Sequence, residues 1–291
     1  MLLSTQTQRL QINFGYEQAI KMLAKAGYDA FDMSLFHPLS SDDPLYKEDF
    51  IGYAKKLREL ADREGIVCNQ AHAPFPSSTP EHDKDEEIFN SIIHAMKIAS
   101  VLGAKCIIVH PKQHMPYRAN AEELKRINME FYKTLIPYCG EFDINVAIEN
   151  MWQHNPVNKS TITNSTCSRV EEFCDYIDTL NSDRIVACLD IGHVSLCGED
   201  MSVMIRGLGG KRLKALHVHD TDGVKDLHTL PFTSCNDFPL IMKLLKEIGY
   251  DGDLTFEADS FFRNFPLSMH QDVANFMQIT GRTLIKMFEE G

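Results

Sequence analysis

Short runs of β-forming residues alternate along the chain with longer segments in which apolar residues recur three and four positions apart. The short runs predict strands, whose side chains alternate between two faces, and the longer segments predict helices that bury one face. The predicted strands lie at 2–7, 30–35, 66–73, 106–111, 145–150, 185–192, 213–220 and 253–258. The predicted helices lie at 16–28, 49–65, 85–104, 123–142, 169–180, 201–208, 238–250 and 268–289.

This alternation implies parallel strands joined by right-handed crossovers. Eight strand–helix units in 291 residues fit an α/β fold of the closed (β/α)₈ TIM barrel type better than an open sheet. No G-x-G-x-x-G motif follows the first strand, so a dinucleotide-binding sheet lacks its main support. No Pro- or Ser-rich linker divides the chain, and we expect one domain over residues 1–291.

Composition narrows the class of protein. With 44% apolar and 24% charged residues, the chain can bury a sizeable core. The net charge of −12 argues against a broad nucleic-acid surface, since such surfaces cluster Lys and Arg. The eight cysteines form no C-x-x-C pair, and no segment is apolar enough for a secretion signal or a membrane span. We expect a cytoplasmic protein with free thiols, no membrane contact and self-association as an open option.

Acidic and imidazole side chains lie at the carboxyl ends of the last four predicted strands. Glu149, Asp190, His217 and Glu257 each stand where a barrel enzyme places its reactive groups. The residues two positions earlier are small (Ala147, Cys188, Ala215 and Thr255), whereas the opposite parity is mostly bulky. Because residues two apart share a face, all four groups are predicted to point into the barrel.

Three carboxylates in an apolar barrel mouth would repel one another and lose hydration. A divalent cation removes this conflict. Three carboxylates and one imidazole suit six-coordinate Mn²⁺, Mg²⁺ or Co²⁺, and added histidines favour Zn²⁺. We expect one divalent metal, with Mn²⁺ preferred. A single acid at a strand end is more often a helix cap, but four in register are hard to explain that way.

Other polar and aromatic groups join this end of the barrel. His72 and His110 follow the third and fourth strands, where each could bind a ligand or form a hydrogen bond in the mouth. Trp152 and Phe75 could form a platform for the apolar face of a substrate, or pack within loops. The stretch HVHDTDGVKDLH (217–228) carries three histidines and three aspartates directly after the seventh strand.

The motifs AHAPF, VHP, AIEN, LDIGH, HVHD, D-x-H and FEAD, between about residues 70 and 259, resemble the xylose isomerase-like barrel superfamily. That superfamily holds sugar phosphate isomerases and epimerases together with endonuclease IV-type apurinic nucleases. In its ketose epimerases, the groups matching Glu149, Asp190, His217 and Glu257 hold one metal. The resemblance implies that the two glutamates transfer protons and that His193 contacts the substrate.

The resemblance to the nucleases implies a different metal content. Those enzymes carry three zinc ions, and their additional ligands match His72, His110, His193, Asp226 and His228. D-x-H also recurs in members that resemble sugar isomerases. The segment after it is TLPFTSC instead of a Gly-rich one, and His219 stands where the nucleases usually carry Asn.

The sequence therefore predicts a metal-dependent sugar or sugar phosphate isomerase or epimerase that transfers protons through a metal-stabilised enediolate. Its partner would be a small carbohydrate, and Glu149 and Glu257 would be the proton-transfer pair. Lys112 or Arg118 could meet a phosphate, or be solvated loop residues. The alternatives are an endonuclease IV-type zinc phosphodiesterase on abasic DNA, an inosose-type dehydratase, and a barrel that binds a sugar without turnover.

Overall fold

The computed structural model describes residues 1–291, and at its centre lies a ring of eight parallel strands. Hydrogen bonds join six of them into one curved sheet and the first and last into a pair, and single bridges from Gln6 to Asp32 and from Val218 to Phe256 link the two parts. The predicted (β/α)₈ barrel is confirmed. The ring consists of β1 (Leu3–Thr5), β2 (Ala30–Ser34), β3 (Val67–His72), β4 (Cys106–Ile108), β5 (Asn145–Glu149), β8 (Ile185–Asp190), β9 (Leu213–His217) and β10 (Leu254–Phe256).

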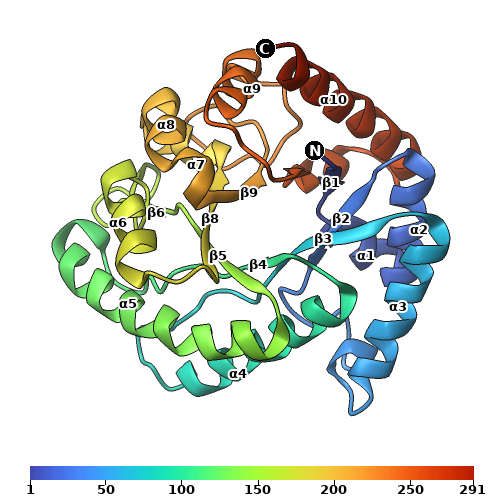
Figure 1. Ribbon diagram of the computed structural model, residues 1–291, viewed down its shortest axis with the longest axis horizontal. Coiled ribbons are helices and arrows are strands. Elements are labelled where there is room, and N and C mark those ends of the chain that lie inside the picture. The colour runs from blue at the N-terminus through green and yellow to red at the C-terminus, as the bar shows by residue number, and fades with distance from the viewer.

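The helices surround these strands as an outer ring, with the last helix beside the first strand–helix unit (Figure 1). They are α1 (Gln8–Phe14), α2 (Tyr16–Ala26), α3 (Phe50–Glu64), α4 (Asp85–Leu102), α5 (Tyr117–Phe142), α6 (Val170–Leu180), α7 (Ile191–Leu196), α8 (Met201–Arg212), α9 (Phe238–Glu247) and α10 (His270–Glu290). Three short 3₁₀ helices are η1 (Pro44–Tyr46), η2 (Asp259–Asn264) and η3 (Leu267–Met269). No helix combines the length and the apolar character that crossing a membrane requires.

The two faces of the barrel strands pack into separate clusters, as the parity of the sequence predicts. Bulky residues of the outward parity, such as Val146, Leu189 and Phe256, belong to a cluster of 69 buried residues between strands and helices. Six small or medium residues fill the barrel interior as a second cluster: Cys106, Ile108, Ala147, Val186, Cys188 and Ala215. A narrow interior leaves room at its carboxyl end for polar side chains.

The prediction of one domain over 1–291 stays a prediction.

The main differences from the predicted elements lie near the carboxyl ends of the strands. The hairpin β6 (Trp152–His154) and β7 (Ile162–Asn164), together with α1 and α7, was not predicted. Each is a single short piece of three to seven residues, too short for its periodicity to be read. Helix α5 begins earlier than predicted, with a kink at Asn120. These short pieces line the end of the barrel where the acidic groups lie.

Candidate functional site

Four acidic or imidazole side chains meet at the carboxyl ends of β5, β8, β9 and β10. They are Glu149, Asp190, His217 and Glu257, and one ligand atom from each lies within 4.8 Å of all the others. None is more than 7% exposed. The structure therefore brings together the four residues that the sequence singled out as metal ligands, although ligation itself stays a prediction.

The ring of His217 has two different neighbours. Its Nδ1 lies 3.0 Å from Glu149 Oε1 and 3.1 Å from Glu257 Oε2. Its Nε2 lies 3.5 Å from Asp32 Oδ2, and neither Nε2 nor Asp32 Oδ1 has a hydrogen-bond partner. Burial lowers the pKa of His217, but surrounding negative charge, including Glu257 and Glu149, raises that pKa well above its usual value.

This arrangement fits a divalent cation. If Nδ1 of His217 carries a lone pair toward a cation, Nε2 carries the proton and faces the buried Asp32 carboxylate, a common outer partner of metal-binding histidines. Burial raises the pKa of Glu149, but His217 and His110 hold it well below its usual value, so the carboxylate is charged. Several buried carboxylates and one oriented imidazole are the ligand set that a hard or borderline cation requires.

Amide side chains hold the carboxylates in place. Gln6 Nε2 donates to Glu257 Oε1 at 2.6 Å, and Gln70 Nε2 donates to Asp32 Oδ2 at 2.9 Å. Asn150 exchanges two hydrogen bonds with the backbone of Asp190, at 2.8 and 2.9 Å. These supporting residues were not predicted. Asp32, in the middle of β2, and Gln6, directly after β1, follow the inward parity, and that signal could have identified them.

Asp190 also begins a helix. Its Oδ1 accepts from the backbone N–H of His193 at 2.7 Å and so caps α7, while both its oxygens lie 3.0–3.1 Å from His219 Nε2. The next residue but one is Gly192, where a Cβ would lie 2.0 Å from the His219 ring. The helix-cap role considered from the sequence is therefore present, together with a place in the cluster.

His72 and His110 stand beside Glu149 on its side away from Glu257. His110 Nε2 lies 2.9 Å from Glu149 Oε2, and His72 Nε2 lies 3.1 Å from His110 Nε2. Burial and the neighbouring His110 lower the pKa of His72 well below its usual value, so this imidazole is neutral and able to bind a cation. His72, Glu149 and His217 form a second group within 4.8 Å.

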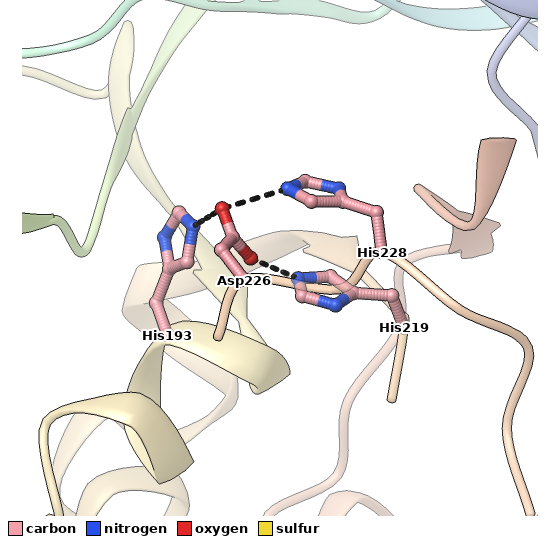
Figure 2. A group of neighbouring side chains, drawn as sticks. All are labelled: His193, His219, Asp226 and His228. Atoms are coloured by element: carbon pink, nitrogen blue, oxygen red, sulfur yellow. Dashed lines mark hydrogen bonds and ion pairs between the residues drawn. The ribbon is translucent and has the colours of Figure 1, made fainter. Parts of the chain in front are cut away.

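A further cluster comes from α7 and the loop after β9. Figure 2 shows the Asp226 carboxylate among three imidazoles, with one oxygen toward His193 and His228 and the other toward His219. The nitrogen–oxygen distances are 3.6, 2.9 and 3.8 Å in that order. Ligand atoms of all four residues lie within 4.8 Å of one another. The histidine- and aspartate-rich stretch 217–228 thus serves two adjacent clusters.

In the cluster of His193, His219, Asp226 and His228, the acid and the imidazoles shift one another's pKa values. Burial raises the pKa of Asp226, but the imidazoles of His193 and His228 bring it well below its usual value. Burial lowers the pKa of His193, but Asp190 and Asp226 raise it to about 10. In the protein alone, a positively charged His193 therefore offsets part of the negative charge of Asp190 and Asp226.

The clusters lie beneath a cavity of about 870 Å³ at the barrel mouth. The side chains of Phe75 and Trp152 line it, and Trp152 Nε1 donates to Asp226 Oδ2 at 3.2 Å. Glu149, Glu257, His72, His110, His193, Asp226 and His228 also line it, whereas Asp190 and His217 are fully buried behind them.

The cationic side chains of this cavity are not the two that the sequence offered as possible phosphate contacts. Lys112 and Arg118 do not line it, and Lys112 Nζ instead lies 3.1 Å from Asp85 Oδ2. Arg9 and Arg263 do line it. Arg9 lies in α1, which was not predicted, and Arg263 lies in a 3₁₀ helix without a periodic signal.

Comparison with known proteins identifies relatives of several activities. A family profile described as xylose isomerase-like TIM barrel matches residues 20–273. A probable endonuclease 4 of Metamycoplasma arthritidis is 23% identical over 208 residues, which cover 69% of this chain and 70% of the relative. An inosose dehydratase of Clostridium perfringens (strain ATCC 13124) is 23% identical over 273 residues, covering 84% and 82%.

Solved structures share the whole fold. A D-tagatose 3-epimerase-like protein superimposes with a TM-score of 0.75 at 19% identity, covering 100% of this chain and 99% of the other. The IOLI protein with a bound zinc atom gives a TM-score of 0.71 at 17% identity, with the same coverage. At such identities the likeness establishes the fold.

Proposed function

The chain belongs to the xylose isomerase-like TIM barrel family, and from this premise we propose that it is a divalent-metal-dependent sugar or sugar phosphate isomerase or epimerase. One observation carries the proposal. Glu149 and Glu257 come from different strands, yet a carboxylate oxygen of each lies 3.0–3.1 Å from the same nitrogen of His217. Two carboxylates that border one cavity can each exchange a proton with the same bound substrate.

Glu149, Asp190, His217 and Glu257 would hold the cation. Mn²⁺ is proposed first, because three oxygen donors and one nitrogen suit it, while Mg²⁺, Co²⁺ and Zn²⁺ are alternatives. The zinc atom of the IOLI structure supports a metal in this fold. When bound, a divalent cation supplies Lewis acidity toward a substrate carbonyl and its neighbouring hydroxyl.

The side chains of the cavity divide the remaining work. One glutamate removes the proton from the carbon beside the carbonyl, and the other returns a proton to the same carbon or to the adjacent one. His193 donates a hydrogen bond that orients a substrate hydroxyl, since its Nε2 faces the cavity beside Asp226. Phe75 and Trp152 offer apolar surface to the sugar, and Phe75 is 47% exposed toward solvent.

Proton exchange is the direct test. The Mn²⁺-loaded protein would be incubated in D₂O with a panel of ketoses and aldoses and with their phosphates. Deuterium at a carbon beside the carbonyl is the expected result, even where net conversion is small. If no sugar acquires deuterium while the protein holds its metal, the isomerase proposal is wrong.

The cluster of His193, His219, Asp226 and His228 favours one rival activity. Three groups of side chains could each hold a metal ion, two of them sharing Glu149 and His217, and a zinc phosphodiesterase acting on abasic DNA would use several such ions. The net charge of −12 opposes DNA binding. Three tightly held zinc ions per chain and nicking of an abasic duplex would favour this rival, whereas about one Mn²⁺-type ion favours the isomerase.

A dehydratase could use the same four metal ligands, and an inosose dehydratase is among the relatives. Loss of 18 Da from a cyclic ketose, measured by mass spectrometry, would identify it. The proposed partner is in each sugar-directed case a small carbohydrate. Cytoplasmic location and homo-oligomerisation stay predictions.

A further inference from the structure

The cavity at the barrel mouth has its permanent cations on one edge only. Arg9 and Arg263 are its only Lys or Arg side chains. Other edges present aromatic rings, such as Phe36, Phe75 and Trp152, or imidazoles. A substrate in this cavity therefore meets fixed positive charge at a single place.

That place adjoins one of the proposed proton-transfer residues. Strands β1 and β10 pair in register, with Thr5 opposite Phe256, so the segments that follow them run side by side. Gln6 Nε2 donates to Glu257 Oε1 at 2.6 Å. Arg9 follows Gln6 by three residues in α1, and α1 packs against η2, which contains Arg263. Both guanidinium groups thus come from the segments directly beyond the Gln6–Glu257 pair.

Arg9 has hydrogen-bonding capacity to spare. Its Nε is buried and has no hydrogen-bond partner. Its nearest acid is Asp259, at 3.9 Å from a terminal nitrogen, which is too long for a hydrogen bond. By contrast, Arg206 and Arg212 elsewhere each bind a carboxylate through two nitrogens at 2.7–3.0 Å. Arg9 therefore lines the cavity without a hydrogen-bonded carboxylate partner.

A guanidinium group carries donors in a rigid fork that matches phosphate and carboxylate oxygens. The Arg9 side chain is 24% exposed and its terminal nitrogen lies 3.9 Å from the nearest acid, so the terminal nitrogens can donate hydrogen bonds to an anion that enters the cavity. Loops after the last barrel strands are also a frequent place for phosphate groups in this architecture. We propose that Arg9 and Arg263 bind an anionic terminal group of the substrate, so that the substrate is a sugar phosphate or a sugar acid.

This inference rests on the proposed isomerase function and specifies its substrate class. Asp259 lines the same edge and partly offsets the two arginines. Removing Asp259 and removing Arg9 should therefore change the affinity for an anion in opposite directions. Removing the Arg9 charge weakens binding of an anion, whereas removing the Asp259 charge strengthens it.

A set of three small probes with one carbon skeleton tests the subsite. Glycerol 3-phosphate, D-glycerate and glycerol would be titrated calorimetrically into the Mg²⁺-loaded protein of residues 1–291. We expect one or both anions to bind at least about 10-fold more tightly than glycerol, as charge-assisted hydrogen bonds imply. The preferred anion separates a sugar phosphate substrate from a sugar acid.

Three variants locate the binding. Arg9→Gln should weaken anion binding about 10- to 100-fold, and Asp259→Asn should strengthen it about 2- to 5-fold, with glycerol binding unchanged in both. Arg206→Gln, which removes an exposed charge on α8, is the matched control and should change nothing. If Arg9→Gln fails to fold, Asp259→Asn still tests the proposal.

Two binding results would overturn the inference: equal binding of the three probes, or anion binding that neither Arg9→Gln nor Asp259→Asn alters. In the second case the anion binds the metal directly. Failure of the isomerase function is distinguishable, because it leaves arginine-dependent anion binding intact while no sugar exchanges deuterium. A third result is deuterium exchange that is equally efficient with neutral sugars and with their phosphates and acids. That result would refute the anion subsite but support the isomerase function.

Discussion

The barrel opens at both ends into cavities of similar size, about 870 Å³ at the carboxyl ends of the strands and about 740 Å³ at their amino ends. Both are polar. At the amino end, charges are paired across the rim: Arg212 with Asp178, Lys214 with Asp251, and Lys105 with Asp253. At the carboxyl end, buried carboxylates converge on one another and on imidazoles. Volume and polarity alone therefore do not distinguish a reactive site from a balanced ionic surface.

The two cavities are joined by polar contacts through the barrel interior. Asn69, which lines the amino-end cavity, donates to Thr255 Oγ1 at 3.2 Å, and Thr255 Oγ1 donates to Gln70 Oε1 at 3.1 Å. Gln70 then donates to Asp32 beneath the candidate metal site. Since both ends carry polar groups that are connected in this way, the two ends differ in whether their acids are paired with Lys and Arg. The following substitutions test that difference.

The largest difference is expected in turnover. Replacing Glu149 or Glu257 by Gln should lower proton exchange by about 10³-fold or more, because each loses its proton-accepting group, while sugar binding persists. The matched control at the other mouth is Asp251→Asn, which should leave exchange unchanged. Deuterium incorporation and sugar titration would measure the two quantities. Unchanged exchange in both glutamine variants would refute their assigned role.

A smaller difference is expected in metal affinity. Asp32 faces His217 Nε2 and should orient that ring, so Asp32→Asn should weaken metal binding about 10- to 100-fold. Competition with a chromophoric chelator measures this directly. Asp43→Asn is the control, because Asp43 is equally buried but bonds Tyr16 and loop N–H groups away from the site. Equal metal affinity in the two variants would exclude a positioning role for Asp32.

Low pH should decrease the free energy of unfolding of the metal-free protein, because Asp190 becomes protonated. Burial raises the pKa of Asp190, but His193 and His219 bring it down to about 2. An unfolded aspartate titrates near pH 4, so this group stabilises the fold above about pH 4 and loses that contribution as pH falls through about 2. The contribution is on the order of 2 kcal/mol.

Urea unfolding of the metal-free wild type and of Asp190→Asn between pH 6 and pH 3 measures this effect. The difference in free energy of unfolding between the two proteins should narrow toward low pH. A difference that stays constant over this range would show that Asp190 has no depressed pKa.

The smallest effect is expected at the amino-end rim. Asp178 binds Arg212 at 2.7 and 2.8 Å, but its side chain is 55% exposed. Asp178→Asn should therefore lower the free energy of unfolding by less than about 1 kcal/mol, and by less still in high salt. Thermal unfolding at two salt concentrations checks this. A larger, salt-independent loss would mean that this end is not merely a balanced surface.

Local patterns in the sequence determined the barrel and the acids at its mouth. Alternating periodicities predict eight strand–helix units. The parity of Ala147, Cys188 and Ala215 places Glu149, Asp190 and His217, each two positions later, inside the barrel. Both signals involve neighbours within one strand, so they can be read without knowing the fold. The four predicted ligands meet as expected for that reason.

Only the tertiary structure decided which residues support those four and which cations reach the cavity. Gln6 bonds Glu257 across 251 positions, and Asp32 meets His217 from β2. Arg9 reaches the cavity and Lys112 does not. These contacts depend on closure of the barrel and on the paths of short, aperiodic segments. Parity alone places Gln6 and Asp32 inside the barrel, but no period in the chain relates them to Glu257 and His217. Closure of the barrel, which pairs β1 with β10, determines which residues they contact.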